Sequence, residues 1–157
     1  MSKSVERRPL EQAQNIAWEL VKVLGPLCEE LEVCGSIRRM KPTVGDIDLL
    51  VVPKADFRKA FEAIGGKVTS ATAKLTVQGM SVDVYFTDSS RWVPMLLFLT
   101  GSKEENIRLR SIAKSRGWKL SQYGLFDEYG DRLDTELYDE VGFYTLLGEP
   151  YKRPEDR

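Results

Sequence analysis

Three aspartates occupy positions where strands could bring carboxylates together. Asp46 and Asp48 lie two residues apart in the aliphatic run DIDLLVV, and Asp83 lies in SVDVYFT. Because side chains alternate between the faces of a strand, Asp46 and Asp48 point the same way, with Cα atoms roughly 6–7 Å apart. If the two strands are neighbours, the carboxylates converge, and their mutual repulsion makes divalent cations the natural counter-charge. Two Mg²⁺ ions held there could stabilise the attacking and leaving oxygens of an in-line displacement on a phosphate substrate.

The alternative is a set of strand-end aspartates that are simply exposed to water, as most aspartates are. The context argues against it, because Asp is depleted in strand interiors and yet recurs here inside strongly apolar strand patterns. The sequence also contains no histidine, which excludes Ser-His-Asp and Cys-His catalysis and histidine-bearing zinc sites. Enzyme chemistry would therefore have to come from carboxylates, Lys, Arg, Tyr and metal ions.

A basic turn precedes the first two aspartates. Gly35-Ser36 follows a short strand pattern and opens a segment that carries Arg38, Arg39 and Lys41. Glycine lets the backbone approach a phosphate, the serine hydroxyl can donate a hydrogen bond, and the Arg39 guanidinium is a planar fork suited to phosphate oxygens. Gly-Ser alone is usually only a turn. Gly-Ser shortly before Asp-x-Asp, with arginines between them, favours a nucleotide-phosphate site.

The composition is that of an ordinary globular protein: 157 residues, 42% hydrophobic and 30% charged. No apolar run reaches the roughly 18 residues of a membrane helix, and the N-terminal residues lack the apolar core of a secretory signal, so no membrane partner and a cytoplasmic location are expected. Cys28 and Cys34 are expected to be reduced packing residues. The net charge of −1 is a mild argument against a nucleic-acid partner.

Hydrophobic periodicity predicts an α/β (α+β) chain of two lobes, residues 1–88 and 89–157. Helices are expected at about 9–24, 55–66, 91–99, 102–117 and 135–148, and strands at 31–34, 46–52, 74–78, 81–87 and within 118–133. The strands at 74–78 and 81–87 form a predicted hairpin. Ser102 and Glu105 form a predicted capping box. Aromatic residues expected to serve in packing are Trp18, Trp92, Trp118, Tyr138, Phe143 and Tyr144.

The motifs together cover almost the whole chain in a characteristic order. They are Gly35-Ser36-x-Arg38-Arg39, Gly45-Asp46-Ile47-Asp48-Leu49-Leu50, Thr100-Gly101-Ser102-Lys103 with Asn106, Leu120-Ser121-Gln122-Tyr123-Gly124-Leu125, Gly148-x-Pro150-Tyr151 and Pro154-Glu155-Asp156-Arg157. The first two resemble the signature of the nucleotidyltransferase superfamily. The whole set resembles the family X DNA polymerases, the group that includes DNA polymerase beta.

That resemblance implies a palm lobe with a mixed β-sheet flanked by helices at 1–88, and a small α/β thumb-like lobe at 89–157. It implies that Asp46, Asp48 and Asp83 hold two Mg²⁺ ions, with Mn²⁺ as a substitute, and that Asp83 draws the proton from the primer 3′ hydroxyl. The residues it implies for nucleotide binding are Gly35, Ser36, Arg39, Gly45 and Arg7 near the triphosphate, Phe98, Leu99, Thr100 and Gly101 beneath the sugar, and Asn106 at the nascent base pair.

Two departures from the family pattern bear on function. Phe98-Leu99 stands where many members carry Tyr-Phe, so ribose discrimination is expected to differ. The chain also begins at the palm, whereas family members usually carry N-terminal DNA-binding lobes, so weak DNA binding is expected.

The predicted helix after residue 102 carries a polar face suited to DNA. Residues at three- and four-residue steps along it are Lys103, Asn106, Arg110 and Lys114, while Leu109, Ile112 and Ala113 can pack inward. The resemblance places Asn106 and Arg110 at the minor groove of the nascent pair, and Lys103, Arg110 and Lys114 are the expected DNA contacts. The alternative is a solvated helix face. A basic face also tempers the net-charge argument, since the distribution of charge matters more than its sum.

The sequence therefore predicts a template-directed DNA polymerase that adds deoxynucleotides to a primer 3′ end by two-metal-ion transfer, in short-gap repair. Its expected partners are primer-template or gapped DNA and deoxynucleoside triphosphates, and it is expected to be a monomer. One alternative is a small nucleotidyltransferase that modifies an RNA, a protein or a small molecule without a template, which would not need the Thr100–Asn106 block. Another is a catalytically silent DNA-binding or scaffold module, against which the retained aspartates argue.

Overall fold

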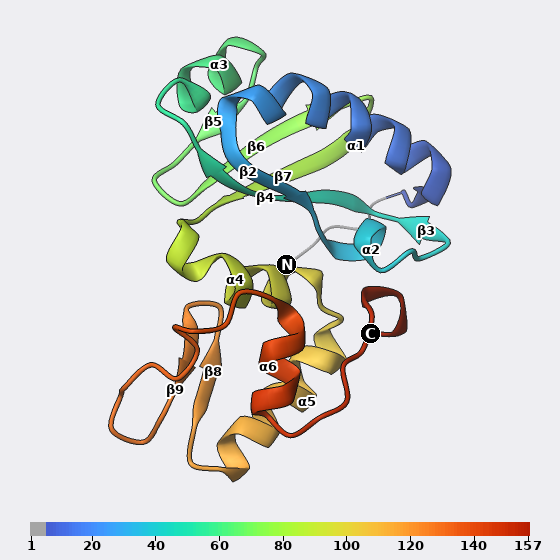
Figure 1. The fold of residues 1–157 in the computed structure, drawn as a ribbon. Helices are drawn as coiled ribbons and strands as arrows, with labels where there is room; N and C mark the ends of the chain where they lie inside the picture. The colour runs from blue at the N-terminus through green and yellow to red at the C-terminus, as the bar shows by residue number, and fades with distance from the viewer. Residues whose placement is uncertain (1–5) are drawn as a thin grey trace. The chain divides into compact units, whose positions relative to one another are not determined.

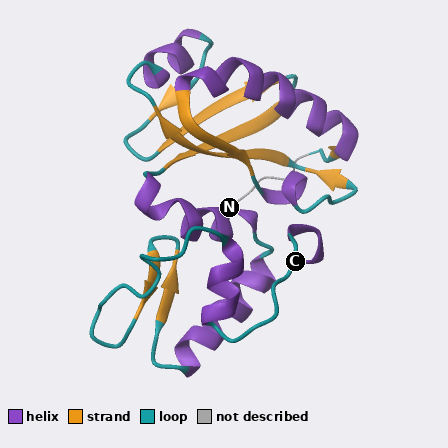
Figure 2. Cartoon of the chain, viewed as in Figure 1, coloured by secondary structure: helices purple, strands orange, loops and turns teal. Residues whose placement is uncertain are grey.

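The computed structural model describes residues 6–157, and contacts between Cα atoms divide the chain into two units, Met1–Thr87 and Asp88–Arg157 (Figure 1). The sequence placed the lobe boundary one residue later, between 88 and 89. Both units mix helices with strands (Figure 2), which confirms the predicted α/β fold class. We call them unit 1 and unit 2.

Unit 1 is built on a five-stranded mixed sheet with the strand order β2-β4-β7-β6-β5. The strands are β2 (Cys28–Val33), β4 (Asp46–Pro53), β5 (Lys67–Val68), β6 (Thr72–Val77) and β7 (Met80–Phe86). β4 and β7 run parallel, and every other neighbouring pair is antiparallel. The predicted hairpin is confirmed as β6–β7, and its turn at Gln78-Gly79 follows from the readiness of glycine to adopt a positive φ, here 80°.

Helices α1 (Leu10–Leu24) and α3 (Phe57–Ala63) cover one face of this sheet (Figure 1). The strand β4 sends Ile47, Leu49 and Val51 into that core, and each is 0% exposed. Because side chains alternate along a strand, the same three residues direct Asp46 and Asp48 to the opposite face. The remaining short elements of unit 1 are β1 (Arg8–Pro9), η1 (Gly25–Leu27), α2 (Gly35–Arg38) and β3 (Thr43–Val44).

Unit 2 packs helices against a small hairpin. Its elements are η2 (Ser89–Arg91), α4 (Trp92–Thr100), α5 (Lys103–Ser115), β8 (Lys119–Ser121), β9 (Gly124–Phe126), α6 (Glu140–Leu146) and η3 (Pro154–Asp156). The core contains Leu109 and Ala113 from α5, Leu125 from β9, and Phe143 and Tyr144 from α6. Among the helices that residues 6–157 form, none combines the length and the apolar character that crossing a membrane requires.

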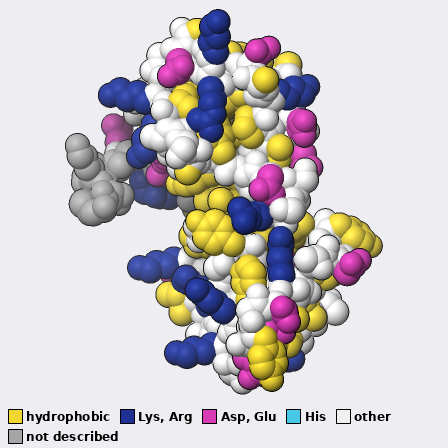
Figure 3. Space-filling model, turned by 90° about the vertical axis from the view of Figure 1, so that its left-hand side faces the viewer, with side chains coloured by type: hydrophobic (Ala, Val, Ile, Leu, Met, Phe, Trp, Pro, Cys, Tyr) yellow, Lys and Arg dark blue, Asp and Glu magenta, His cyan; other side chains and the backbone are white. Residues whose placement is uncertain are grey.

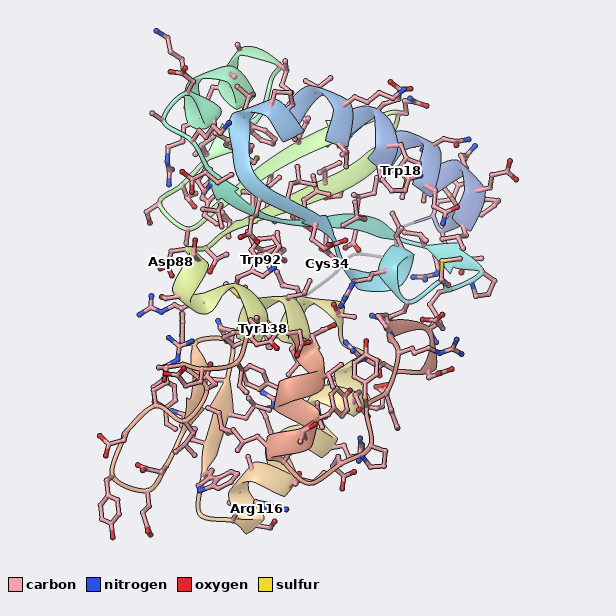
Figure 4. All side chains as sticks on the ribbon, in the orientation of Figure 1. Trp18, Cys34, Asp88, Trp92, Arg116 and Tyr138 are labelled. Carbon is pink, nitrogen blue, oxygen red and sulfur yellow. The ribbon has the colours of Figure 1, made fainter. Side chains whose placement is uncertain are left out.

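Several local predictions need correction. The last helix begins at Glu140 rather than near 135, because the Asp139 carboxylate caps it by accepting a hydrogen bond from the Gly142 amide at 2.9 Å. Tyr138 lies in the loop before this cap and is 89% exposed, and Trp18 on α1 is 58% exposed (Figure 4), so neither is a packing residue.

The other packing predictions are confirmed. Trp92 and Trp118 pack partly buried against the core of unit 2, and Phe143 and Tyr144 are 0% exposed. Cys28 and Cys34 are both buried, and neither forms a disulfide within the described residues. Burial raises the pKa of Cys28 to about 11, which keeps this thiol protonated at neutral pH.

Glu105 lies at the centre of a buried polar network in unit 2. The Ser102 hydroxyl accepts a hydrogen bond from the Glu105 amide, as predicted, but the Glu105 side chain does not complete the capping box. Its carboxylate accepts hydrogen bonds from Arg108 at 2.9 Å and from the Tyr144 hydroxyl at 2.7 Å, and Lys152 approaches to 3.4 Å. The Arg108 hydrogen bonds are the main reason that the pKa of Glu105 falls to about 2. The carboxylate therefore contributes stability above its ordinary pKa of 4.5, and that contribution disappears as the pH falls towards 2.

Replacing Glu105 with Gln should lower the free energy of unfolding by about 2–4 kcal/mol at neutral pH, because the buried network loses the carboxylate that accepts from Arg108 and Tyr144, while Glu149 remains an ion-pair partner of Arg108. Urea denaturation followed by circular dichroism measures the change. The control is Glu104→Gln, an exposed carboxylate one residue away on α5, which should change stability by less than about 0.5 kcal/mol. Equal effects of the two variants would show that the network does not stabilise unit 2.

Candidate active site

The structure brings the three predicted aspartates together at one point of the unit 1 sheet. β4 and β7 are adjacent and parallel, and their register sets Asp48 directly opposite Asp83, with Asp46 opposite Ser81. One carboxylate oxygen from each of Asp46, Asp48 and Asp83 lies within 4.8 Å of the others. The condition set by the sequence, that the two strands be neighbours, is therefore met.

Burial and mutual repulsion perturb this cluster. The pKa of Asp48 rises to about 7, first because burial disfavours its charge and then because Asp46 and Asp83 repel it, while the nearby Arg39 cation opposes the rise. The pKa of Asp46 is also raised, mainly by burial and by the charge of Asp83, and Arg7 acts in the other direction. Three ionised carboxylates are thus unfavourable here without added positive charge.

The residues of the cluster fit a divalent cation. Asp83 Oδ1 is buried and makes no hydrogen bond to the described residues, and the Lys74 Nζ lies 3.5 Å from it in an ion pair. A buried carboxylate oxygen without a hydrogen-bond donor is costly unless a cation serves it. All the donors are hard oxygens, which suit Mg²⁺ or Mn²⁺ rather than zinc.

The Gly-Ser segment packs directly against the cluster. The sequence predicted a turn here, and the structure has the single helical turn α2, beginning at Gly35. A Cβ built on Gly35 would lie only 2.4 Å from Asp48 Oδ2, and Gly35 has a φ of +60°. The amide of Cys34, just before it, donates a 2.8 Å hydrogen bond to the Asp48 carbonyl oxygen. Gly35 therefore packs the predicted phosphate-binding segment against Asp48, one of the predicted metal ligands. Ser36 and Arg39 lie on the same short segment.

Arg7 and Gly45 also meet next to Asp46. The Arg7 guanidinium donates hydrogen bonds to the Thr43 hydroxyl at 2.9 Å and to the Thr43 carbonyl oxygen at 2.7 Å. A Cβ on Gly45 would come within 3.0 Å of an Arg7 nitrogen. The family resemblance implied that Arg7 lies near the triphosphate, and in the structure its charge lowers the pKa of Asp46, which is consistent with that position.

The remaining predicted residues lie in unit 2. Phe98 and Leu99 are partly exposed near the end of α4, and the Asn106 amide group donates a 2.9 Å hydrogen bond to the Phe98 carbonyl oxygen. Thr100 is fully buried, and its hydroxyl donates to the Leu96 carbonyl oxygen at 2.7 Å, so that hydroxyl faces its own helix. Gly101, which follows Thr100, is buried as well.

The polar face of α5 forms as predicted. Lys103, Arg110 and Lys114 are exposed, Asn106 is partly exposed, and Leu109 and Ala113 are buried. One hydrogen bond orients the Arg110 side chain on this face: its Nε donates to the Asn106 carbonyl oxygen at 3.3 Å.

Sequence reasoning missed Lys74. Its strand β6 pairs with β7 in a register that sets Lys74 opposite Asp83. The hairpin itself was predicted, and counting back from its turn pairs Val77 with Met80 and then Lys74 with Asp83. The position of Lys74 beside Asp83 could therefore have been predicted from the hairpin register.

Comparison with known proteins is informative at this point. Residues 95–157 match the DNA polymerase beta thumb family. The DNA polymerase/3'-5' exonuclease PolX of Bacillus subtilis is 30% identical over 167 aligned residues, which cover 99% of this chain and 29% of that protein. The repair DNA polymerase X of African swine fever virus is 24% identical, over 88% of this chain and 86% of the viral protein. The chain therefore spans less than a third of the length of the bacterial relative.

A solved structure shares the fold. The polymerase beta of Leishmania infantum, described as a ternary P/T complex, superposes with a TM-score of 0.72 at 23% sequence identity. The match covers 97% of this chain and 77% of that one. It agrees with the mixed sheet and the flanking helices described above.

Proposed function

We propose that this chain, which belongs to the family X DNA polymerases, is a template-directed DNA polymerase that fills short gaps during repair. The observation that carries the proposal is the cluster of Asp46, Asp48 and Asp83, with one carboxylate oxygen of each within 4.8 Å of the others, against which Gly35 packs. Its substrates would be deoxynucleoside triphosphates and primer-template or gapped DNA, and it would act as a monomer.

In this proposal each residue of the cluster has a role in one displacement. Asp46, Asp48 and Asp83 would hold two Mg²⁺ ions, which when bound supply positive charge to the triphosphate and to the attacking and leaving oxygens. Asp83 would accept the proton of the primer 3′ hydroxyl. The 3′ oxygen forms a bond to the α-phosphorus, the bond from that phosphorus to the bridging oxygen breaks, and pyrophosphate leaves. The Ser36 hydroxyl and the Arg39 guanidinium would hold the β- and γ-phosphates.

Unit 2 would supply the test of the base pair. Asn106 and Arg110 share one face of α5, and minor-groove acceptors occupy similar positions in all correct pairs. An Asn–Arg arrangement can therefore sense the shape of the pair without reading its sequence. Lys103 and Lys114, exposed on the same helix, would contact DNA phosphates.

The competing function is nucleotidyl transfer without a template, to an RNA, a protein or a small molecule. Single-nucleotide insertion on four gapped DNA substrates, one for each template base, separates the two. A polymerase inserts the complementary nucleotide on each substrate. Equal incorporation of all four nucleotides on every substrate would favour the transferase.

Replacing Arg110 with Ala should reduce templated insertion at least about tenfold, since it removes one side of the proposed pair test, while triphosphate binding to unit 1 changes little. Insertion kinetics and equilibrium binding of a nonhydrolysable triphosphate measure the two quantities. The control is Arg153→Ala, which removes an equal charge from an exposed position of the same unit. If both variants insert nucleotides like the unaltered protein, Arg110 has no role in reading the template.

A further inference from the structure

A hollow of about 470 Å³ lies beside α5 and β8 in unit 2. Its lining includes Phe98 from α4, Arg110 and Lys114 from α5, Trp118, and Lys119 at the start of β8. The volume lies within the range of about 300–1,000 Å³ that is common for small-ligand sites. The sequence assigned Phe98, Arg110 and Lys114 to nucleotide or DNA, but it gave Trp118 a packing role and Lys119 none. Trp118 and Lys119 are therefore the new elements of this surface.

The rim of the hollow is positive. Arg110, Lys114 and Lys119 are all exposed, and no acidic residue belongs to the described lining. Within residues 6–157, none of these three cations forms an ion pair with a carboxylate. Figure 3 shows Lys and Arg side chains, in dark blue, gathered over the same unit in the lower half of the view. Cations without internal partners keep their charge available for an anionic ligand.

The wall of the hollow is aromatic. Trp118 packs partly buried against the unit 2 core, and its amide donates a 2.9 Å hydrogen bond to the Ala113 carbonyl oxygen, so both its ring and its backbone are held. The Arg116 guanidinium, at the end of α5 (Figure 4), lies 5.5 Å from the centre of the Trp118 ring. Phe98 contributes a second, partly exposed ring. A rigid indole bordered by cations offers a flat surface and positive charge together.

An aromatic wall with a positively charged rim favours single-stranded over double-stranded nucleic acid. In a duplex the base faces are stacked on one another, so an aromatic ring in a hollow cannot reach them, and cations alone would serve its phosphates. In a single strand the bases are free to stack on aromatic side chains while lysines follow the backbone. We propose that the hollow binds an unpaired nucleotide of single-stranded DNA, with its base stacked on Trp118 and its phosphates held by Lys114 and Lys119.

The proposed polymerase function supplies the identity of that strand, and only this part of the inference rests on it: the strand is the template beyond the point of insertion. The hollow would hold an unpaired template base out of the duplex. Binding of free single-stranded DNA needs neither a triphosphate nor a metal ion, so it is measurable whether or not the chain catalyses transfer.

The first test is the affinity for a fluorescently labelled oligothymidylate and for a duplex of equal length, both without metal or triphosphate. Trp118→Leu should weaken single-strand binding at least about fivefold, since stacking of one base contributes at that scale, and should change duplex binding less than twofold. Trp118→Phe keeps an aromatic face and should retain most of the affinity. The matched control is Trp18→Leu, an exposed indole on α1, which should change neither affinity.

Lys119→Ala provides a second readout that does not depend on the packing of Trp118. Lys119 is exposed, so the variant should fold normally. It should lower the slope of log affinity against log salt for the single strand by about 0.7, the contribution of one phosphate contact. Lys67→Ala, an exposed lysine on β5, should leave the slope unchanged. An unchanged slope for Lys119→Ala, or equal losses of single-strand and duplex binding for Trp118→Leu, would overturn the proposal.

A third measurement separates this inference from the proposed function. On a primer-template with a single-stranded template overhang, Trp118→Leu should raise the KM for DNA at least about fivefold, whereas a template that ends at the coding base should show no change. A chain that binds oligothymidylate through Trp118 but extends no primer would contradict the polymerase function and leave the hollow as described. If the chain extends primers and its KM for DNA changes neither with Trp118→Leu nor with the overhang, the proposed single-strand site is wrong and the polymerase function stands.

Discussion

Asp48→Asn is expected to slow nucleotide transfer at least about 10³-fold and, in the same molecule, to stabilise the metal-free protein at about pH 8. The first effect follows from removing one negative charge from the proposed metal cage, where about 4 kcal/mol of transition-state stabilisation corresponds to that factor. The second follows because burial first, and then the charges of Asp46 and Asp83, raise the pKa of Asp48 to about 7, so the ionised carboxylate is unfavourable at pH 8. An amide of the same shape removes that repulsion.

The sign of the pH dependence follows from the same shift. Asp48 keeps its proton up to about pH 7 in the folded protein and loses it near 3.8 when unfolded, so between these values the folded state binds the extra proton. The stability of the metal-free protein should therefore fall as the pH rises from about 4 to about 7. Asp48→Asn lacks this loss. Its advantage should grow to at most about 4 kcal/mol above pH 7 and vanish below about pH 4, at about 1.4 kcal/mol for each unit of pKa difference.

Urea unfolding in the presence of a chelator measures the stability, and primer extension with Mg²⁺ measures the activity. The control is Asp56→Asn, an exposed aspartate before α3 that should change neither quantity. Near-normal turnover by Asp48→Asn would contradict its assignment as a metal ligand. A loss of activity together with lower stability at pH 8 would show that Asp48 serves the fold rather than the metal.

Gly35→Ala is expected to lose at least about 10²-fold in activity, more than its loss of stability can explain. The new Cβ would lie 2.4 Å from Asp48 Oδ2, so the carboxylate or the α2 backbone must move. Misplacement of a reacting group by about 1 Å can lower a rate by that factor. Alanine at a φ of +60° also costs roughly 1–2 kcal/mol of stability, whatever it contacts.

Gly65→Ala separates the clash from the backbone strain. Gly65 has a φ of +96°, and a Cβ there meets nothing within 4 Å. Both variants should therefore lose a similar amount of stability, which thermal unfolding measures, but Gly65→Ala should retain full activity. Equal activities in the two variants would mean that Asp48 tolerates displacement and that Gly35 is not needed to hold the cluster.

The cluster of Asp46, Asp48 and Asp83 was predictable because it depends on the local sequence pattern. Alternation in DIDLLVV gives the shared face of Asp46 and Asp48, and apolar neighbours on both strands require that Asp83 project to the same side. What the pattern could not supply was the parallel pairing of β4 with β7, which sets Asp48 opposite Asp83. Parallel neighbours are joined through distant connections, so nothing in the local sequence encodes their register.

The errors concern features that tertiary context decides. Trp18 follows the buried Ala17 on α1 but is 58% exposed, because the buried face of the helix is formed by Ala13, Ile16, Ala17, Leu20 and Leu24. Glu105 was predicted to cap α5, yet Arg108 and Tyr144 draw its carboxylate inward. The final helix starts late because the Asp139 carboxylate caps it, while the earlier Asp134 carboxylate accepts hydrogen bonds from Arg132 and from the Leu125 amide. For Glu105 and for the final helix, hydrogen-bond partners that the local sequence pattern does not specify determined the structure.

We propose that this chain transfers a nucleotide to a DNA primer under instruction from a template. The most direct test is a single-turnover insertion into gapped DNA with one nucleotide triphosphate at a time, in Mg²⁺ and after chelation, with the released pyrophosphate quantified. Only the complementary nucleotide should be added, chelation should stop the reaction, and one pyrophosphate should appear for each primer extended. Absence of extension, or extension that ignores the template base, would contradict it.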